Sequence, residues 1–104
     1  SKVKMMALKI IYRTKRLEKE CTDFYEAQKK HGIRMAEIIH QRIQQIQAAD
    51  SVDILLKYKI GRCHRLEGDR KEEIAMDLVH PFRLVFIETD RIELVRIQEI
   101  EDYH

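Results

Sequence analysis

Apolar side chains in the first half of the chain recur every three or four residues, the spacing that places them along one side of a helix. The first such stripe predicts a helix that begins after Thr14, its N-cap, and ends at Gly32. Its core face consists of Leu17, Cys21, Phe24 and Gln28, with Tyr25 beside it. A second helix is expected from Ile33 to Ala49 and Asp50, with Ala36, Ile39, Ile43 and Ile46 toward the core and Arg34, Gln41, Arg42 and Gln45 facing away. The short link between the stripes predicts a helical hairpin.

The spacing of apolar residues changes to two after about residue 60, which is typical of strands. This alternation begins with Ile74, Met76 and Leu78, which are separated by Ala75 and Asp77. Further strands are expected over residues 83–87 and 92–100, and another over residues 7–12 precedes the first helix. Turns are expected at residues 68–71, 80–81 and 89–90, whose Gly, Pro and Asp suit tight reversals. The second half therefore predicts an antiparallel meander.

Together these elements predict an α+β fold, in which an N-terminal strand and a two-helix hairpin pack on one face of an antiparallel β-sheet. With 104 residues, the chain is expected to form one domain over residues 1–104. Residues 1–6 precede the first patterned strand; we interpret them as partly a cloning remnant and assign them no function.

Charge is distributed unevenly along the chain. The net charge is only +2, but residues 1–50 hold 11 Lys and Arg against 6 Asp and Glu, whereas residues 51–104 hold 9 against 12. A basic half can lie along a phosphate backbone, while the small overall charge argues against an indiscriminate nucleic-acid binder. A solvated helix face accounts for the same excess equally well. Charge alone thus permits RNA binding without requiring it.

Cysteine usage and hydropathy point to an ordinary cytoplasmic protein. Cys21 and Cys63 lie far apart without CxxC spacing, so we expect two reduced thiols, no zinc site and no other cofactor. No apolar run approaches the roughly 18 residues of a membrane span. We therefore expect a soluble chain that does not contact a membrane.

Four segments of the second half carry a family resemblance. They are residues 63–71 (CHRLEGDRK), 75–78 (AMDL), 82–86 (FRLVF) and the terminal Asp102-Tyr103-His104. In this order and spacing they resemble the HigB branch of the RelE/ParE toxin superfamily, over about residues 7–104. The resemblance implies a single RelE-like domain, in agreement with the α+β fold predicted from the pattern.

The resemblance also implies a function. HigB-like toxins of type II toxin-antitoxin systems are ribosome-dependent mRNA endonucleases, need no metal, inhibit translation and arrest growth. They are neutralised by a HigA-like helix-turn-helix antitoxin, which implies here a complex of two toxins and two antitoxins that reaches operator DNA only through the antitoxin. The chain itself shows no DNA-reading helix-turn-helix.

RNA cleavage without a metal needs a base for the ribose 2′-OH, an acid for the leaving oxygen, and donors around the developing phosphorane. The resemblance places catalytic residues at His64, Asp102, Tyr103 and His104. Histidine suits either proton role because its unperturbed pKa is about 6.5. Asp102 could be a base or orient an imidazole, and Tyr103 could stack on a base, contact a phosphate or cap the core. For Asp102 and His104 the alternative is a disordered polar terminus, and for His64 a histidine on the sheet surface.

Positive charge for the phosphate is expected from Arg83, which matches an arginine of the family, although a surface ion pair with Asp77 or Glu93 is an equal alternative. The sequence departs from the family at Glu67, where a lysine is usual, and at Phe82, where a tryptophan is usual. A carboxylate at position 67 would repel a phosphate unless Glu67 itself acts as a base or other cations compensate. The cations available nearby are Arg65, Arg70 and Lys71.

Two other functions remain open. A ParE-like relative would poison DNA gyrase without cutting RNA, and a catalytically silent relative would bind an antitoxin and tune repression. The histidines and the terminal Asp-Tyr-His favour the nuclease over the gyrase poison, while Glu67 favours the silent partner. His31, His40 and His80 are assigned to structure or solvent.

Overall fold

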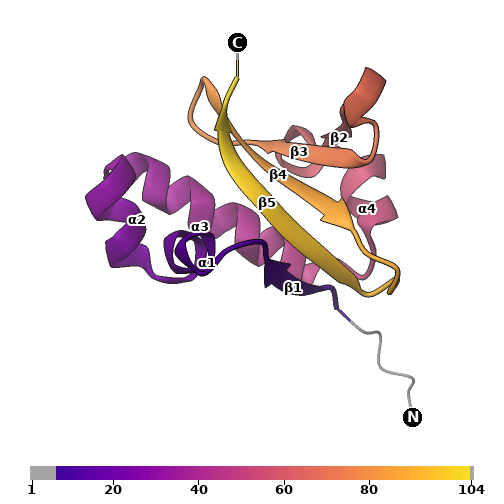
Figure 1. Ribbon diagram of the computed structural model, residues 1–104, viewed down its shortest axis with the longest axis horizontal. Helices are drawn as coiled ribbons and strands as arrows, with labels where there is room; N and C mark the ends of the chain where they lie inside the picture. The colour runs from indigo at the N-terminus through magenta and orange to yellow at the C-terminus, as the bar shows by residue number, and fades with distance from the viewer. Residues whose placement is uncertain (1–6, 104) are drawn as a thin grey trace.

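A five-stranded sheet carries a layer of helices on one face in the computed structural model, which describes residues 7–103 (Figure 1). The strands are β1 (Lys9–Tyr12), β2 (His64–Arg65), β3 (Glu73–Asp77), β4 (Phe82–Glu88) and β5 (Leu94–Asp102), in the spatial order β1-β5-β4-β3-β2. Strands β2 to β5 form the predicted antiparallel meander. Strand β1 joins the β5 edge in parallel, with Lys9 opposite Leu94. The predicted α+β fold class is confirmed, and the parallel edge strand adds to it.

The helical layer consists of α1 (Lys15–Thr22), α2 (Phe24–His31), α3 (Ile33–Ala48) and α4 (Val52–Lys57), with the 3-10 turns η1 (Ile60–Arg62) and η2 (Gly68–Arg70) beside the sheet. Thr14 caps α1 as predicted, because its Oγ1 accepts a hydrogen bond from the Leu17 N–H at 3.0 Å. Gly32 ends α2 at a φ of +90°, also as predicted. Helix α4 is an addition, capped by Ser51. No helix within residues 7–103 combines the length and apolarity needed to cross a membrane.

The first predicted helix is wrong in one respect, because it is broken at Asp23 into α1 and α2. Asp23 has an extended backbone, and its Oδ1 accepts hydrogen bonds from the backbone N–H groups of Tyr25 and Glu26 in the first turn of α2, at 3.0 and 3.3 Å. The buried residue of α2 is Ala27. A single unbroken helix would place Phe24 on the core face and Tyr25 beside it. In the structure these side chains are 39% and 79% exposed, respectively.

The core lies between α3 and the covered face of the sheet. Helix α3 buries the predicted stripe together with Met35. The sheet contributes Ile74, Met76, Leu84, Phe86, Val95 and Ile97. Both cysteines are buried as free thiols, and burial raises the pKa of each to about 12. Because the core occupies the face of the sheet that the helices cover, only side chains on the opposite face are available to bind a ligand.

Arg42 does not face away from the core as predicted. It is half-buried, and its Nε donates to the backbone carbonyl of Asp77 at 2.6 Å. Gly61 lies against this side chain, with a φ of +60°, and a Cβ there would lie 2.7 Å from Arg42 Nε. Arg42 thus joins α3 to the end of β3, and glycine provides the space.

A bulge in β5 changes which residues face the helices. Phe86 pairs with Ile97 but Val85 pairs with Glu99, so Gln98 is an extra residue in β5. An inserted residue shifts the alternation of a strand by one position. Val95 and Ile97 therefore point to the core, whereas Glu99 and Glu101 point to the opposite face.

Candidate functional site

The face of the sheet opposite the helices, here called the open face, carries ionisable side chains from several strands. Register partners lie side by side across a sheet. One row on this face holds Asp77, Arg83 and Glu101. The next row holds His64, Ala75, Val85 and Glu99. The open face thus gathers residues from the motifs that are far apart in sequence.

Arg83 lies at the centre of the first row and is only 7% exposed. Its guanidinium binds Glu101 through two nitrogens, with Nε donating at 2.8 Å and Nη2 at 2.6 Å. The Tyr103 ring stacks over it, with Cζ 3.7 Å from the ring centroid. Arg83 is therefore a buried, oriented cation, and its partner is neither of the two carboxylates considered from the sequence.

Arg70 reaches from η2 across the open face to β5. It donates to both carboxylate oxygens of Glu101, at 2.7 and 3.1 Å, and also binds Glu73 on β3. Its Nη2 lies 3.5 Å from Glu99. These hydrogen bonds, foremost those to Glu101 and Glu73, raise the pKa of Arg70 further above its ordinary value. Arg70 and Arg83 thus converge on one carboxylate, that of Glu101.

The pKa values of Glu99 and Glu101 on β5 shift in opposite directions because their partners differ. Hydrogen bonds from Arg70, with further ones from Glu99 and Arg83, lower the pKa of Glu101 to about 2. The hydrogen bond to Glu101, together with desolvation, raises the pKa of Glu99. Glu99 is therefore the carboxyl group of this pair that takes up a proton more readily, which is the property of a general acid or base.

His64 occupies edge strand β2, and a backbone carbonyl determines which nitrogen of its ring carries the proton in the neutral form. Its Nδ1 lies 2.7 Å from the carbonyl oxygen of Arg62. A carbonyl can only accept, so Nδ1 carries the proton and Nε2 of the neutral ring is left as the proton acceptor. The ring lines a cleft of about 290 Å³ together with Lys59, Arg62 and Cys63. His64 is thus a half-buried imidazole beside two cations.

Arg62 links His64 to the C-terminal end of β5. Its Nε lies 2.7 Å from Oδ2 of Asp77. It lines the cleft beside His64 and also a second cavity of about 380 Å³, which is bounded by the β3–β4 turn with His80 and by Tyr103. Sequence reasoning assigned Arg62 no role and placed His80 among structural or solvent residues.

Asp102 and Tyr103, the described residues of the terminal motif, lie toward different sides of the sheet. Tyr103 follows Glu101 onto the open face, where it stacks on Arg83. Asp102 is the register partner of Phe82, whose ring packs against the core, so Asp102 belongs to the alternate side at the exposed end of β5. His104 lies outside the described residues.

The remaining residues predicted to bind RNA lie away from Arg83 and Tyr103. Arg65 pairs with Glu88 at 2.9 Å, at the opposite end of β4 from Phe82. Lys71 and Glu67 are exposed on the loop between β2 and β3. Of the loop cations, only Arg70 reaches the row that contains Arg83.

One sequence signal could have located the carboxylates of the open face. The apolar residues of β5 that face the core are Val95, Ile97 and Ile100, whose spacing changes from two to three. Such a change marks a bulge and moves Glu99 and Glu101 to the other face. No comparable pattern marks Arg62, because it lies in a left-handed turn with a φ of +58°.

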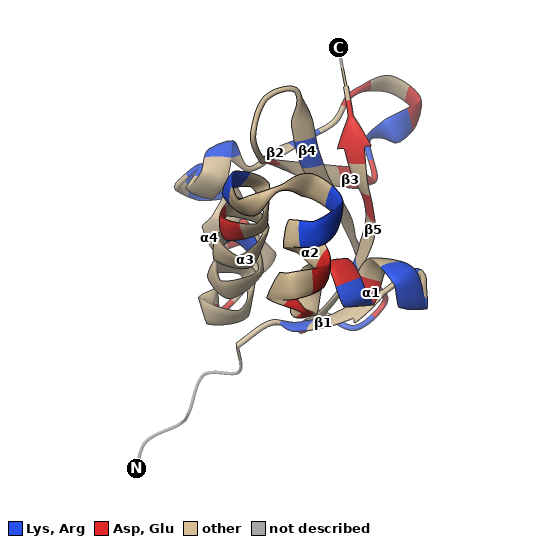
Figure 2. Ribbon diagram, turned by 90° about the vertical axis from the view of Figure 1, so that its left-hand side faces the viewer, with Lys and Arg blue, Asp and Glu red and all other residues tan. Residues whose placement is uncertain are grey.

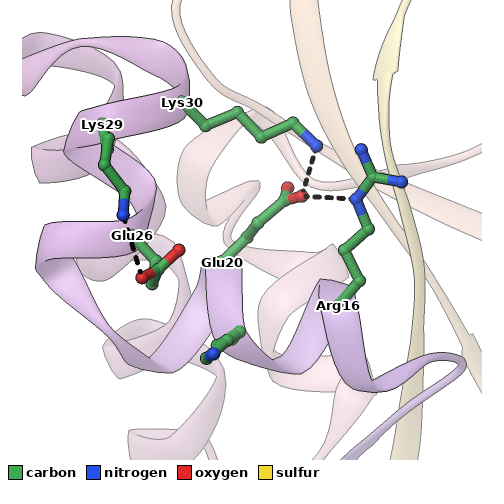
Figure 3. A pocket seen from close by; sticks show the side chains of 6 residues that line it. Arg16, Glu20, Glu26, Lys29 and Lys30 are labelled. Atoms are coloured by element: carbon green, nitrogen blue, oxygen red, sulfur yellow. Dashed lines mark hydrogen bonds and ion pairs between the residues drawn. The ribbon is translucent and has the colours of Figure 1, made fainter.

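A separate charged cavity of about 250 Å³ lies between α1 and α2 (Figure 3). Its cations are partly neutralised: Arg16 and Lys30 contact Glu20, and Lys29 contacts Glu26. Figure 2 likewise shows acidic and basic residues interspersed along both helices. The basic excess of the first half therefore does not form a uniformly positive surface here, and the open face is the stronger candidate site.

The open face holds the kinds of groups that phosphodiester chemistry requires. His64 offers an imidazole, Glu99 a carboxyl group whose pKa is raised, and Arg62 and Arg83 positive charge. Arg83 is already bound to the Glu101 carboxylate. An incoming phosphate therefore has to displace Glu101 from Arg83 or bind Arg83 together with it. The site can thus bind an anion and transfer protons beside an aromatic ring.

Neither a protein-family model nor a curated protein matches the chain. Among solved structures, the YoeB-YefM complex from Staphylococcus aureus is similar in fold, with a TM-score of 0.61 and 18% sequence identity. The match covers 93% of this chain and 97% of that chain. The likeness confirms the RelE-like α+β fold expected from the sequence.

Proposed function

We propose that this chain is the toxin of a type II toxin-antitoxin system and acts as a ribosome-dependent mRNA endonuclease in the cytoplasm. The observation that carries the proposal is the convergence of His64, Arg62, Arg83 and Tyr103 at one end of the open face. These residues come from three separate parts of the sequence.

In this proposal the ribose 2′-OH loses its proton and attacks the adjacent phosphorus, while the P–O5′ bond breaks and the leaving 5′-oxygen takes up a proton. His64 Nε2 is placed to exchange a proton, and His104 follows Tyr103 as a second imidazole for the other transfer. Arg62 and Arg83 neutralise the phosphate as charge develops on it. No metal is needed for these steps.

The proposed partner is a HigA-like antitoxin in an assembly of two toxins and two antitoxins. The fold likeness supports a protein partner in general, since the similar structure is a complex of YoeB with YefM. The HigB assignment and the helix-turn-helix antitoxin rest on the sequence resemblance. Operator DNA would be reached through that antitoxin.

One observation favours the second candidate, a catalytically silent antitoxin-binding protein. Arg70, the loop cation nearest the site, is surrounded by Glu73, Glu99 and Glu101. Three carboxylates around one arginine oppose the approach of a phosphate, as the exposed Glu67 also would.

Mapping of transcript 5′ ends after brief induction separates these functions. The wild type is expected to produce new ends within translated frames and none in ribosome-free RNA. His64→Ala should reduce cleavage about 100- to 10,000-fold, because it removes one proton-transfer group. The matched control is His40→Ala, an exposed histidine on α3, which should cut as the wild type does.

Two results would contradict the proposal. Growth arrest without new RNA ends would reject the nuclease and direct attention to gyrase. No arrest by a folded, ribosome-exposed wild type would favour the silent partner. Unchanged cleavage by His64→Ala would remove His64 from the mechanism while leaving the nuclease in place.

A further inference from the structure

The Glu101 carboxylate occupies the donors of Arg83 that a phosphate would use. Nε and Nη2 of Arg83 both donate to Oε2 of Glu101, at 2.8 and 2.6 Å. The two side chains are only 9% and 14% exposed, and the Tyr103 ring covers the guanidinium. Carboxylates and phosphates bind a guanidinium through the same paired donors. Because Arg83 has so little exposed surface, a phosphate and Glu101 compete for these donors.

Arg70 binds the same carboxylate independently of Arg83. Its Nη2 donates to Oε1 of Glu101 at 2.7 Å, and its Nη1 donates to Oε2 at 3.1 Å. Its Nε donates to Glu73 at 2.9 Å, which anchors the guanidinium to β3. Of the two arginines, only Arg70 reaches Oε1. If Arg83 turned to another anion, Glu101 would therefore keep both hydrogen bonds from Arg70.

This arrangement lowers the cost of separating Arg83 from Glu101. Breaking a buried ion pair by removing one partner is usually destabilising, because the other charge is left buried without compensation. Here the displaced carboxylate stays with Arg70, and the freed guanidinium takes the phosphate. Both charges are thus paired before and after the exchange, so a bound phosphate can shift the equilibrium between the two arrangements.

We propose that Glu101 is an internal competitor that withholds Arg83 from phosphate in the free chain, and that Arg70 retains Glu101 when RNA displaces it. The inference rests on the proposed function for its ligand, the phosphodiester of RNA. It adds a regulation of that same site, because a carboxylate of β5 autoinhibits phosphate binding. Arg70, counted from the sequence among the cations for the phosphate, is then a positioning residue that acts through Glu101.

Binding of a short single-stranded RNA measures this competition in the intact chain. The probe carries a fluorescein label and 2′-O-methyl groups, which prevent cleavage, and its anisotropy is followed at one fixed salt concentration. Glu101→Gln should bind about 10- to 150-fold more tightly than the wild type, the equivalent of one charge-assisted hydrogen bond. The matched control is Glu93→Gln, which removes the same charge from the Arg91–Glu93 pair and should change affinity less than about threefold.

Two double variants separate competition from a change of net charge. Adding Arg83→Gln to Glu101→Gln should abolish the gain in affinity, because the gain acts through the freed guanidinium. Arg70→Gln should weaken binding in the wild type but have little effect beside Glu101→Gln. Equal losses in both backgrounds would show that Arg70 binds RNA directly and would overturn its positioning role. A gain for Glu101→Gln no larger than that for Glu93→Gln would overturn the competition.

The wild type provides a test that does not depend on how Glu101→Gln folds. In isotope-labelled protein, the NMR signals of the Arg83 Nε–H group and the Glu101 carboxylate carbon should shift together as the same RNA is added. The Nε–H signal of Arg70, which donates to Glu73, should stay in place. An RNA-bound state with unchanged Arg83 and Glu101 signals would contradict the displacement.

The failure of this inference can be distinguished from failure of the proposed function. The binding experiments use neither ribosomes nor cleavage, whereas transcript end mapping reports cleavage. Tighter binding by Glu101→Gln that requires Arg83, without any transcript cleavage, would support the competition and reject the nuclease. Transcript cleavage together with unchanged binding by Glu101→Gln would do the reverse.

Discussion

Glu99 and Glu101 are two residues apart on the same strand, and their pKa values move in opposite directions. The folded-state pKa of Glu101 is about 2, below the value of about 4.3 for an unfolded chain. Ionised Glu101 therefore stabilises the fold above about pH 4.3, and this contribution is lost as the pH falls toward about 2. The pKa of Glu99 is raised, so its contribution has the opposite sign and is lost as the pH rises.

This contrast gives a prediction for two matched variants. Glu101→Gln should lower the free energy of unfolding at pH 7 by about 1 to 3 kcal/mol, because it removes charge-assisted hydrogen bonds from Arg70 and Arg83. The deficit relative to the wild type should shrink between about pH 4 and pH 2. Glu99→Gln should leave stability at pH 7 unchanged or higher. Urea unfolding at several pH values measures both, and a Glu101→Gln deficit that stays constant with pH would contradict the ionic explanation.

At the residue scale, the sequence identified part of the candidate site. The motifs indicated His64, Arg83 and Tyr103, and all three lie on the open face. The motifs could not indicate that Arg83 is buried against Glu101. That burial and that pairing depend on the bulge in β5 and on Arg70, which reaches across the open face to Glu101. Asp102 illustrates the same limit, since adjacent residues of a strand point to opposite faces whatever motif they share.

At the scale of elements, the break between α1 and α2 depends on one side chain. Asp23 caps α2 by accepting hydrogen bonds from two backbone N–H groups. We predict that Asp23→Ala lowers the free energy of unfolding by about 0.5 to 2 kcal/mol, the usual effect of losing an N-cap. Asp23→Asn should cost much less, because asparagine caps about as well. Urea denaturation compares the two, and equal losses would show that the cap does not determine the break.

The helices and strands were predicted where local signals agree with the tertiary structure. Thr14 and Gly32 bound the first helical segment because a cap and a left-handed stop act within one turn. The apolar spacing continues past Asp23, so periodicity alone predicted one continuous helix. The spacing of Asp23 and Glu26 resembles the capping box that marks the start of a helix. The parallel pairing of β1 with β5 had no local signal, since its partners are 85 residues apart.

At the scale of the whole molecule, stability should be greatest at the centre of the sheet. Strand β4 lies between β5 and β3, and its Leu84, Val85 and Phe86 are fully buried. Strand β2 is a two-residue edge. Amides of β4 are therefore predicted to exchange hydrogen only through global unfolding, whereas those of β2 and α2 exchange through local opening. Native-state hydrogen exchange measures this, and equal protection of β2 and β4 would contradict it.

The parallel pairing of β1 with β5 has a practical consequence for how the protein is handled. Lys9 enters the sheet beside Leu94, and β5 then runs for eight residues, about 26 Å, before it reaches Asp102 (Figure 1). An affinity handle or fluorescent fusion placed before β1 therefore joins the molecule far from Tyr103. The same fusion placed after Tyr103 would lie next to the cavity that Tyr103 lines beside the β3–β4 turn and would block access to it. A protease site in the linker would allow the fusion to be removed.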